Sequence, residues 1–89
     1  MMKEWLQEQT TLQQAEQDHL LKDERLGPNP IPFGFQHEQW LRFKAQIKPG
    51  DEIWKFSSSA DSWQHLAGRA GLCIVRNGEI VDSIVTMKN

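Results

Sequence analysis

The sequence lacks the features of a secreted or membrane-bound protein. Its single cysteine, Cys73, excludes an internal disulfide and fits a reducing compartment. The longest uninterrupted apolar run, residues 72–75, is far shorter than the roughly 20 apolar residues of a membrane-spanning helix. The N-terminal residues contain no apolar stretch of signal-peptide length. These absences predict a cytoplasmic protein with no membrane partner.

The sequence also lacks an excess of basic residues. Ten lysines and arginines stand against twelve aspartates and glutamates, which gives a net charge of -2. A chain of this charge has no general attraction for a phosphate backbone, so nucleic acid is not an expected partner. The acidic residues gather at the start of the chain, because residues 1–26 alone carry a net charge of -3.

Motifs for cofactors and metals are absent as well. No Gly-Lys-Ser or Gly-Lys-Thr phosphate loop and no Rossmann glycine spacing occurs. One cysteine and three histidines that lie far apart in the sequence do not make a zinc motif. The sequence therefore predicts neither a cofactor nor a metal.

What the chain does have is enough apolar material for one small domain. It is 89 residues long, 38% hydrophobic, and contains four tryptophans and four phenylalanines. A chain of this length buries about 60 to 65% of the surface that its unfolded form exposes, which leaves room for one modest core. We therefore expect a single domain over residues 1–89.

The N-terminal third is predicted to be an acidic helix. Residues 3–26 contain no glycine or proline and are rich in Glu, Gln, Lys and Leu, which favour helices. Trp5, Leu12 and Leu26 fall seven or fourteen residues apart, but too few apolar companions accompany them for a coiled coil. Thr11 and Gln14 resemble a capping box, so an alternative starts the stable helix there and leaves residues 1–10 frayed or in a separate turn.

A proline-rich connector and a second helix follow. Prolines at 28, 30 and 32 force extended backbone, so residues 27–34 are expected to be a stiff connector. An amphipathic helix over residues 36–47 is predicted by the spacing of Trp40, Phe43 and Ile47, which places them on one face toward the core. Pro49 and Gly50 end this helix.

About three β-strands are expected in the rest of the chain, which makes the fold class α+β. Residues 51–57 alternate in the way of a strand, with Glu52, Trp54 and Phe56 on one side. Residues 58–70 connect this strand to the next and contain a short helix capped by Asp61 and ended by Gly68. The connection suits a parallel crossover or a loop to an antiparallel neighbour, so the strand order stays open.

The last nineteen residues predict a β-hairpin, because β-branched runs flank Asn77 and Gly78, a pair suited to a type I′ turn. The pairing expected across this turn is Arg76 with Glu79, Val75 with Ile80, Ile74 with Val81, and Leu72 with Ser83. One face would then hold Leu72, Ile74, Val81, Val85 and Met87, and the other Cys73, Val75, Ile80 and Ile84. Both faces are apolar, so both need cover, for which helices, the connector and a partner subunit are the candidates.

The only dense polar cluster lies in the connection before the hairpin. Ser59, Asp61, His65 and Arg69 would form the site if the protein bound an anion or another small ligand, or acted as an enzyme. The cluster matches a catalytic set by composition only, and the chain has no Gly-x-Ser-x-Gly turn. Asp61 would also repel an anion. We therefore expect no catalytic residue and no enzyme.

The function expected from the sequence is that of a small, non-catalytic cytoplasmic interaction or regulatory protein. It would bind another protein or itself, as a homodimer, through the N-terminal helix, an exposed sheet edge or both. The residues expected at the interface are Trp5, Leu12, Val81 and Val85. Trp5 has an equal alternative, in which it folds back onto the core of its own chain.

Overall fold

The computed structural model describes residues 3–88 and shows a mixed α+β fold. The main sheet has the strand order β1-β4-β5-β6, with each neighbouring pair antiparallel. Its strands are β1 (Leu6–Thr10), β4 (Glu52–Ser57), β5 (Arg69–Arg76) and β6 (Glu79–Lys88). A short second ladder pairs β2 (Leu20–Leu21) with β3 (Ile31–Pro32). The helices are α1 (Leu12–Asp18), α2 (His37–Ala45) and α3 (Ala60–Gln64), with 3-10 turns at Lys3–Trp5, Glu24–Leu26 and Gly34–Gln36.

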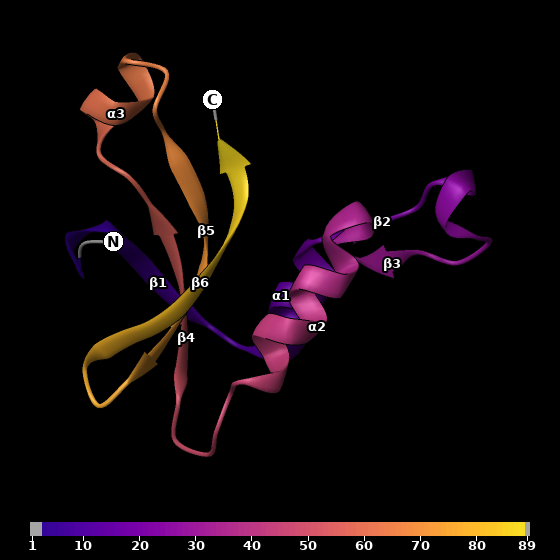
Figure 1. The fold of residues 1–89 in the computed structure, drawn as a ribbon, viewed down its shortest axis with the longest axis horizontal. Helices are drawn as coiled ribbons and strands as arrows, with labels where there is room; N and C mark the ends of the chain where they lie inside the picture. Colours follow the sequence, from indigo (N-terminus) through magenta and orange to yellow (C-terminus); the bar gives the residue numbers. More distant parts are fainter. Residues whose placement is uncertain (1–2, 89) are drawn as a thin grey trace.

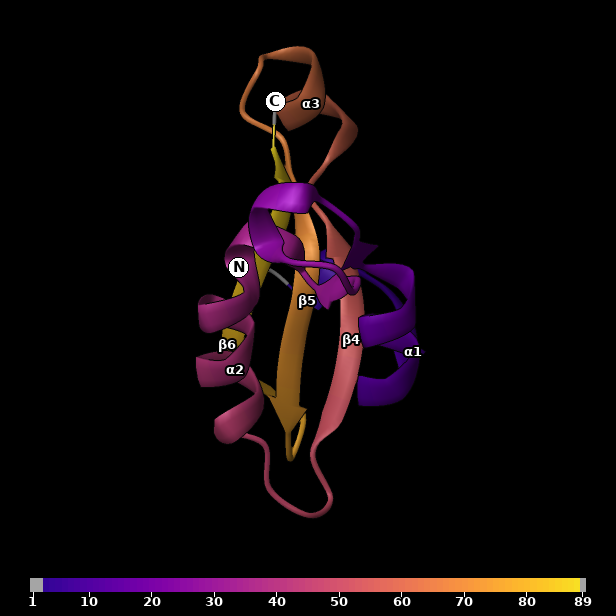
Figure 2. The same ribbon diagram turned by 90° about the vertical axis from the view of Figure 1, so that its right-hand side faces the viewer.

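The two longer helices cover the same face of the main sheet. Figure 1 shows the sheet nearly edge-on, with α1 and α2 both to its right and the β2–β3 ladder farther out on that side. Seen from the right, in Figure 2, α2 lies in front of the β6 side of the sheet and α1 in front of the β4 side. Helix α3 lies at one end of the strands. The opposite face of the sheet carries no α-helix within residues 3–88.

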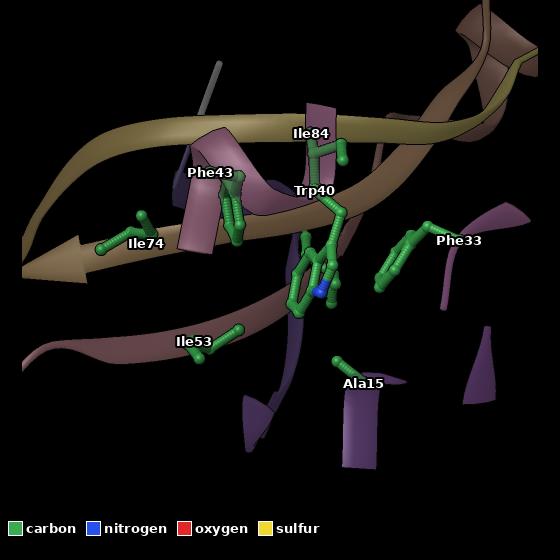
Figure 3. Close-up of a cluster of buried hydrophobic side chains, with 8 residues drawn as sticks. Ala15, Phe33, Trp40, Phe43, Ile53, Ile74 and Ile84 are labelled. Atoms are coloured by element: carbon green, nitrogen blue, oxygen red, sulfur yellow. The ribbon is translucent and has the colours of Figure 1, made fainter. Parts of the chain in front are cut away.

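The main core lies between the two helices and the sheet. Trp40 is fully buried at its centre, with its ring stacked against those of Phe33 and Phe43 at centroid distances of 4.2 and 5.5 Å. Figure 3 shows the indole between these two rings, with Ala15 of α1 beside it. The sheet contributes Ile53, Leu72, Ile74 and Ile84, and Leu12 and Ile47 pack at the margin.

A second apolar cluster lies on the helix-free face of the sheet. Phe56, Cys73 and Val75 are buried there although no helix covers them. Their cover comes from partly buried side chains of the sheet and of the N-terminal turn. These side chains are Trp5, Leu6, Trp54, Ile80 and Val85.

The long N-terminal helix predicted from composition is wrong. Residues 6–10 form β1, which pairs with β4, and only Leu12–Asp18 are α-helical. The physical reason is tertiary: the exposed edge of β4 gains backbone hydrogen bonds from β1, and these outweigh a weak local preference for helix. The capping box is confirmed, because Thr11 Oγ1 accepts the Gln14 N–H at 3.1 Å.

The proline-rich connector is more than a spacer. Its Ile31 and Pro32 form β3, and the next residue, Phe33, is buried in the main core. Phe33 has a φ of 62°, a left-handed conformation that costs a bulky residue energy. This conformation aims its ring between His19 and Trp40, at centroid distances of 4.5 and 4.2 Å, so packing compensates for the backbone strain.

The second helix and the first predicted strand agree with the structure. Helix α2 buries Trp40 and Phe43, and β4 places Trp54 and Phe56 on the opposite side of the sheet from Ile53. The connection from β4 leads to an antiparallel neighbour, β5. Its short helix begins two residues earlier than expected, because Ser59 is the N-cap in place of Asp61.

The hairpin of β5 and β6 turns at Asn77 and Gly78, which have φ values of 52° and 79°. The pairs Arg76–Glu79 and Val75–Ile80 are those expected, but a bulge then shifts the register. Ile74 pairs with Asp82 in place of Val81, and Leu72 with Ile84 in place of Ser83. A one-residue shift reverses the face of each following side chain, so Ile84 lies in the main core and Val85 on the helix-free face.

Replacing Trp40 by alanine is expected to lower the free energy of unfolding by about 3 to 5 kcal/mol, because a fully buried indole and its stacking partners lose their contacts. Leu41→Ala, at the 47% exposed neighbouring position, is the matched control and should cost below about 1 kcal/mol. Denaturant unfolding of both variants measures the difference. Equal losses would show that α2 does not face the sheet in this orientation.

Candidate functional site

The polar cluster predicted from the sequence lies on the α3 loop, and its side chains are exposed. Ser59 Oγ accepts the backbone N–H of Ser62 at 3.3 Å, and His65 Nδ1 lies 2.7 Å from the backbone oxygen of Asp61. Arg69 contacts the loop through its backbone N–H, which donates to Ser58 Oγ at 2.9 Å. These bonds hold the backbone of the loop in shape.

Residues outside the predicted set of Ser59, Asp61, His65 and Arg69 build this loop. Ser58 is buried, and its Oγ lies 2.6 Å from Ser62 Oγ. The indole of Trp63 donates to Ser57 Oγ at 3.1 Å and packs flat on Gly68, where an added Cβ would lie 2.1 Å from the ring. Gly68 is therefore needed for this close contact, and not for the left-handed helix end that the sequence suggested.

The left-handed position after α3 belongs to Leu66, with a φ of 58°. The Ala67 N–H donates to the Ser62 carbonyl at 2.8 Å and the Leu66 N–H to the Trp63 carbonyl at 3.3 Å. These are the two bonds of a Schellman motif, in which the left-handed residue is usually glycine. Leu66 is also 76% exposed. Packing within the described chain therefore does not compensate for the strain of its left-handed backbone.

A charged cluster on the helix side links α1 to the sheet. Lys55 Nζ lies 3.1 Å from Glu8 Oε1 and 3.5 Å from Asp18 Oδ2. Asp18, His19, Lys55 and Thr86 are among the residues that line a cavity of about 420 Å³. The alternation of the β4 strand placed Lys55 on this face, but the position of α1 was needed to bring the carboxylates to it.

Ion pairing keeps the acidic and basic side chains of this cluster charged. Hydrogen bonding to Glu8 raises the pKa of Lys55, so its amine stays protonated and is a poor nucleophile. The hydrogen bond from Gln14 lowers the pKa of Asp18, which keeps it a carboxylate. Burial lowers the pKa of His19, whose ring is stacked on Phe33. The cluster is a set of ion pairs in which Lys55 of β4 contacts Glu8 of β1 and Asp18 of α1.

Cys73 is not an activated thiol. It is fully buried in the centre of the sheet, and burial raises its pKa to about 11. Within residues 3–88, His, Cys, Asp and Glu side chains form no group of three that would hold a metal ion. No helix in that same range has the length and apolar character to cross a bilayer.

A second ion pair joins Arg76, at the turn end of β5, to Asp51, the residue before β4. Arg76 donates from Nε to Asp51 Oδ1 at 2.9 Å and from one terminal nitrogen to Oδ2 at 2.8 Å. The Asp51 side chain is only 2% exposed and also accepts the Lys48 N–H at 2.9 Å. The bond from Arg76, followed by that from Lys48, lowers the pKa of Asp51 from its usual 3.8 to about 2.

The helix-free face of the sheet carries the second apolar cluster, which lies outside the main core. Trp54 lies there partly buried, with its indole N–H donating to Glu52 Oε1 at 2.9 Å. Two of the four predicted interface residues, Trp5 and Val85, belong to this face. Trp5 packs on the cluster of its own chain, which was the alternative considered from the sequence. Leu12 packs against the main core, and Val81 is 41% exposed at the bulge of β6.

Both edge strands of the sheet, β1 and β6, have features that hinder pairing with a strand of another chain. Strand β1 is short, has a bulge between Leu6 and Glu8, and exposes the polar side chains of Gln7, Glu8 and Gln9. Along β6, Gln36 Nε2 donates to the Val85 carbonyl at 2.9 Å, and the Ser83 N–H donates to Asp82 Oδ1 at 2.8 Å. Short length, charge and bulges are known ways to protect an edge.

Comparison of the chain with models of known protein families, with curated proteins and with solved structures gives no match.

Leu66→Gly is expected to raise the free energy of unfolding by about 0.5 to 1 kcal/mol, because glycine adopts the left-handed conformation without the clash of a Cβ. Ala67→Gly is the control, since Ala67 does not have a positive φ and should gain nothing. Thermal unfolding of the two variants is the measurement. Destabilisation by Leu66→Gly would mean that the exposed leucine has a packing role in the fold.

Stability is expected to fall in acid through Asp51. Because its pKa in the folded chain is about 2, below its usual 3.8, the Arg76 pair stabilises the fold fully above about pH 4 and progressively less toward pH 2. Asp51→Asn removes this contribution at every pH. The melting temperatures of the two proteins, measured from pH 6 to pH 2, should therefore converge as the pH falls, and a constant gap would contradict the low pKa.

Proposed function

We propose that this is a small, non-catalytic interaction protein that acts by binding a second copy of itself through the helix-free face of its sheet. The observation that carries the proposal is the cluster of Phe56, Cys73 and Val75, buried under no helix and covered only by Trp5, Trp54 and a few aliphatic side chains. Tryptophans that lie partly exposed over an apolar centre are typical of interface hot spots.

The two sheet edges support this choice of surface. Self-association through an edge requires free N–H and C=O groups in an accessible strand. In β1 the available strand is five residues long with Glu8 at its middle, and in β6 the groups of Ser83 and Val85 are already bonded to side chains. The face has no such obstruction among the residues that the structure describes.

The charges on and around the face support a second copy as the occupant. Glu52 is bonded to Trp54, and Lys3 and Glu79 at the rim lie 3.8 Å apart as an ion pair. A face whose charges are already balanced meets an identical face without strong repulsion, as a two-fold interface requires. Four strands at the usual spacings give the face an area of about 500 Å² in each copy. The surface buried by both copies together would be at the low end for specific interfaces, which predicts a weak, reversible dimer.

Ser83→Lys tests the proposal. Ser83 pairs with Cys73, so its side chain faces the helix-free side, and it is only partly exposed. A lysine there places a charge in each copy at the interface without deleting an apolar contact. We expect the wild type to dimerise reversibly in sedimentation equilibrium between about 1 and 500 µM, and Ser83→Lys to raise the dissociation constant at least tenfold, about 1.4 kcal/mol.

Gln39→Lys is the matched control, because Gln39 is exposed on α2, on the other side of the sheet. It adds the same charge to the chain and should leave the dissociation constant unchanged. A wild type that stays monomeric over the whole range would refute self-binding through this face. An equal rise of the dissociation constant in both variants would show that the added net charge weakens the dimer, and not a change at this surface.

A further inference from the structure

We infer that β6 is a latent pairing edge for β6 of a second copy, held closed in the folded chain by two guards, Gln36 and Asp82. A ten-residue strand at the edge of a sheet is the strongest template for strand addition that this fold offers. The guards occupy the backbone groups that such pairing would use. The inference does not depend on the helix-free face being an interface.

The position of the guards follows from the pattern of an antiparallel strand. Alternate residues of an edge strand bond to the neighbouring strand, and those between them direct their N–H and C=O outward. Ser83 and Val85 are two residues apart, and each has a backbone group bonded to a side chain outside the ladder. The Ser83 N–H goes to Asp82 Oδ1 at 2.8 Å, and the Val85 carbonyl accepts from Gln36 Nε2 at 2.9 Å.

Helix α2 supports both guards. Gln36 stands immediately before its first residue, and Gln46, immediately after its last, donates to Asp82 Oδ2. Gln36 is therefore positioned by the N-terminal end of α2, and Asp82 is held by Gln46 at its C-terminal end. Between these contacts, two hollows of about 440 and 360 Å³ lie along α2 and β6 and leave the strand accessible from the side.

The side chains of β6 suit pairing with a second copy. An antiparallel pair centred on Ser83 would place Ser83 opposite Ser83 of the second copy, and Val81 opposite its Val85. Val81 and Val85 are both apolar, so an apolar pair would form on each side of the centre. In this pairing Glu79 would lie opposite Met87 and Asp82 opposite Ile84 of the second copy, so neither carboxylate would meet a like charge. The guards and the bulges of β6 stand against this arrangement in the folded chain.

The test is the double variant Gln36→Ala with Asp82→Ala, compared with the wild type at equal concentrations. The matched control is Gln64→Ala with Asp82→Asn, which removes an exposed amide from α3 and the same charge from β6 but leaves the residues of both guarding bonds able to form them. Far-UV circular dichroism and the thermal transition show that all three proteins are folded. Sedimentation then gives their masses, and hydrogen exchange followed by NMR gives the protection of single amides.

We expect the mean mass of the guard-free variant at 200 µM to rise above that of the wild type, toward twice its value. Protection of its Ser83 and Val85 amides should rise at least tenfold with concentration, whereas the control should behave as the wild type does. A folded guard-free variant of unchanged mass would overturn the inference. So would a larger mass without added protection at these amides, because the new contact would then lie elsewhere.

Discussion

The fold depends on one hydrogen bond to the fully buried Trp40. A buried indole N–H without a partner is costly, and Glu16 of α1 supplies that partner at 2.8 Å. Lys44 holds the same carboxylate oxygen at 3.2 Å, and the bond from Trp40 is the main cause of the lowered pKa of Glu16. Because Glu16 belongs to a helix of only seven residues, this bond, together with the packing of Leu12 and Ala15, joins α1 to α2.

The position of α1 determines what each face of the sheet becomes. Only Thr11 separates α1 from β1, so anchoring the helix beside α2 sets β1 along the edge of β4. Both longer helices are then on one face, and Trp5 of the N-terminal turn and Leu6 of β1 lie on the other. The second face therefore receives two tryptophans in place of a helix, which is enough to bury Cys73 but leaves Trp54 partly exposed. The candidate interface is thus a consequence of how the core is closed.

Sequence reasoning located the parts that local signals specify. The stripe of Trp40 and Phe43, the alternation of β4 and the turn at Asn77 and Gly78 are all short-range patterns. It failed at β1, because Leu-Gln-Glu-Gln-Thr has no apolar alternation and becomes a strand only beside β4. It also failed at Phe33, since nothing in the sequence marks a phenylalanine for a left-handed backbone. The charged cluster of Lys55 was out of reach for the same reason: its members come from elements whose arrangement had to be known.

The bulge at Val81 connects the face and the edge of β6. Without the inserted residue, Val85 would lie on the helix side and Ile84 on the helix-free face, as the unbulged register predicted. With it, Ile84 fills the main core, and Val85 extends the apolar face. The same insertion brings Asp82 to the helix side, within reach of Gln46, while its other oxygen accepts the next backbone N–H. One extra residue thus moves Asp82 off the helix-free face and places its carboxylate at the adjacent edge, where it occupies the Ser83 N–H.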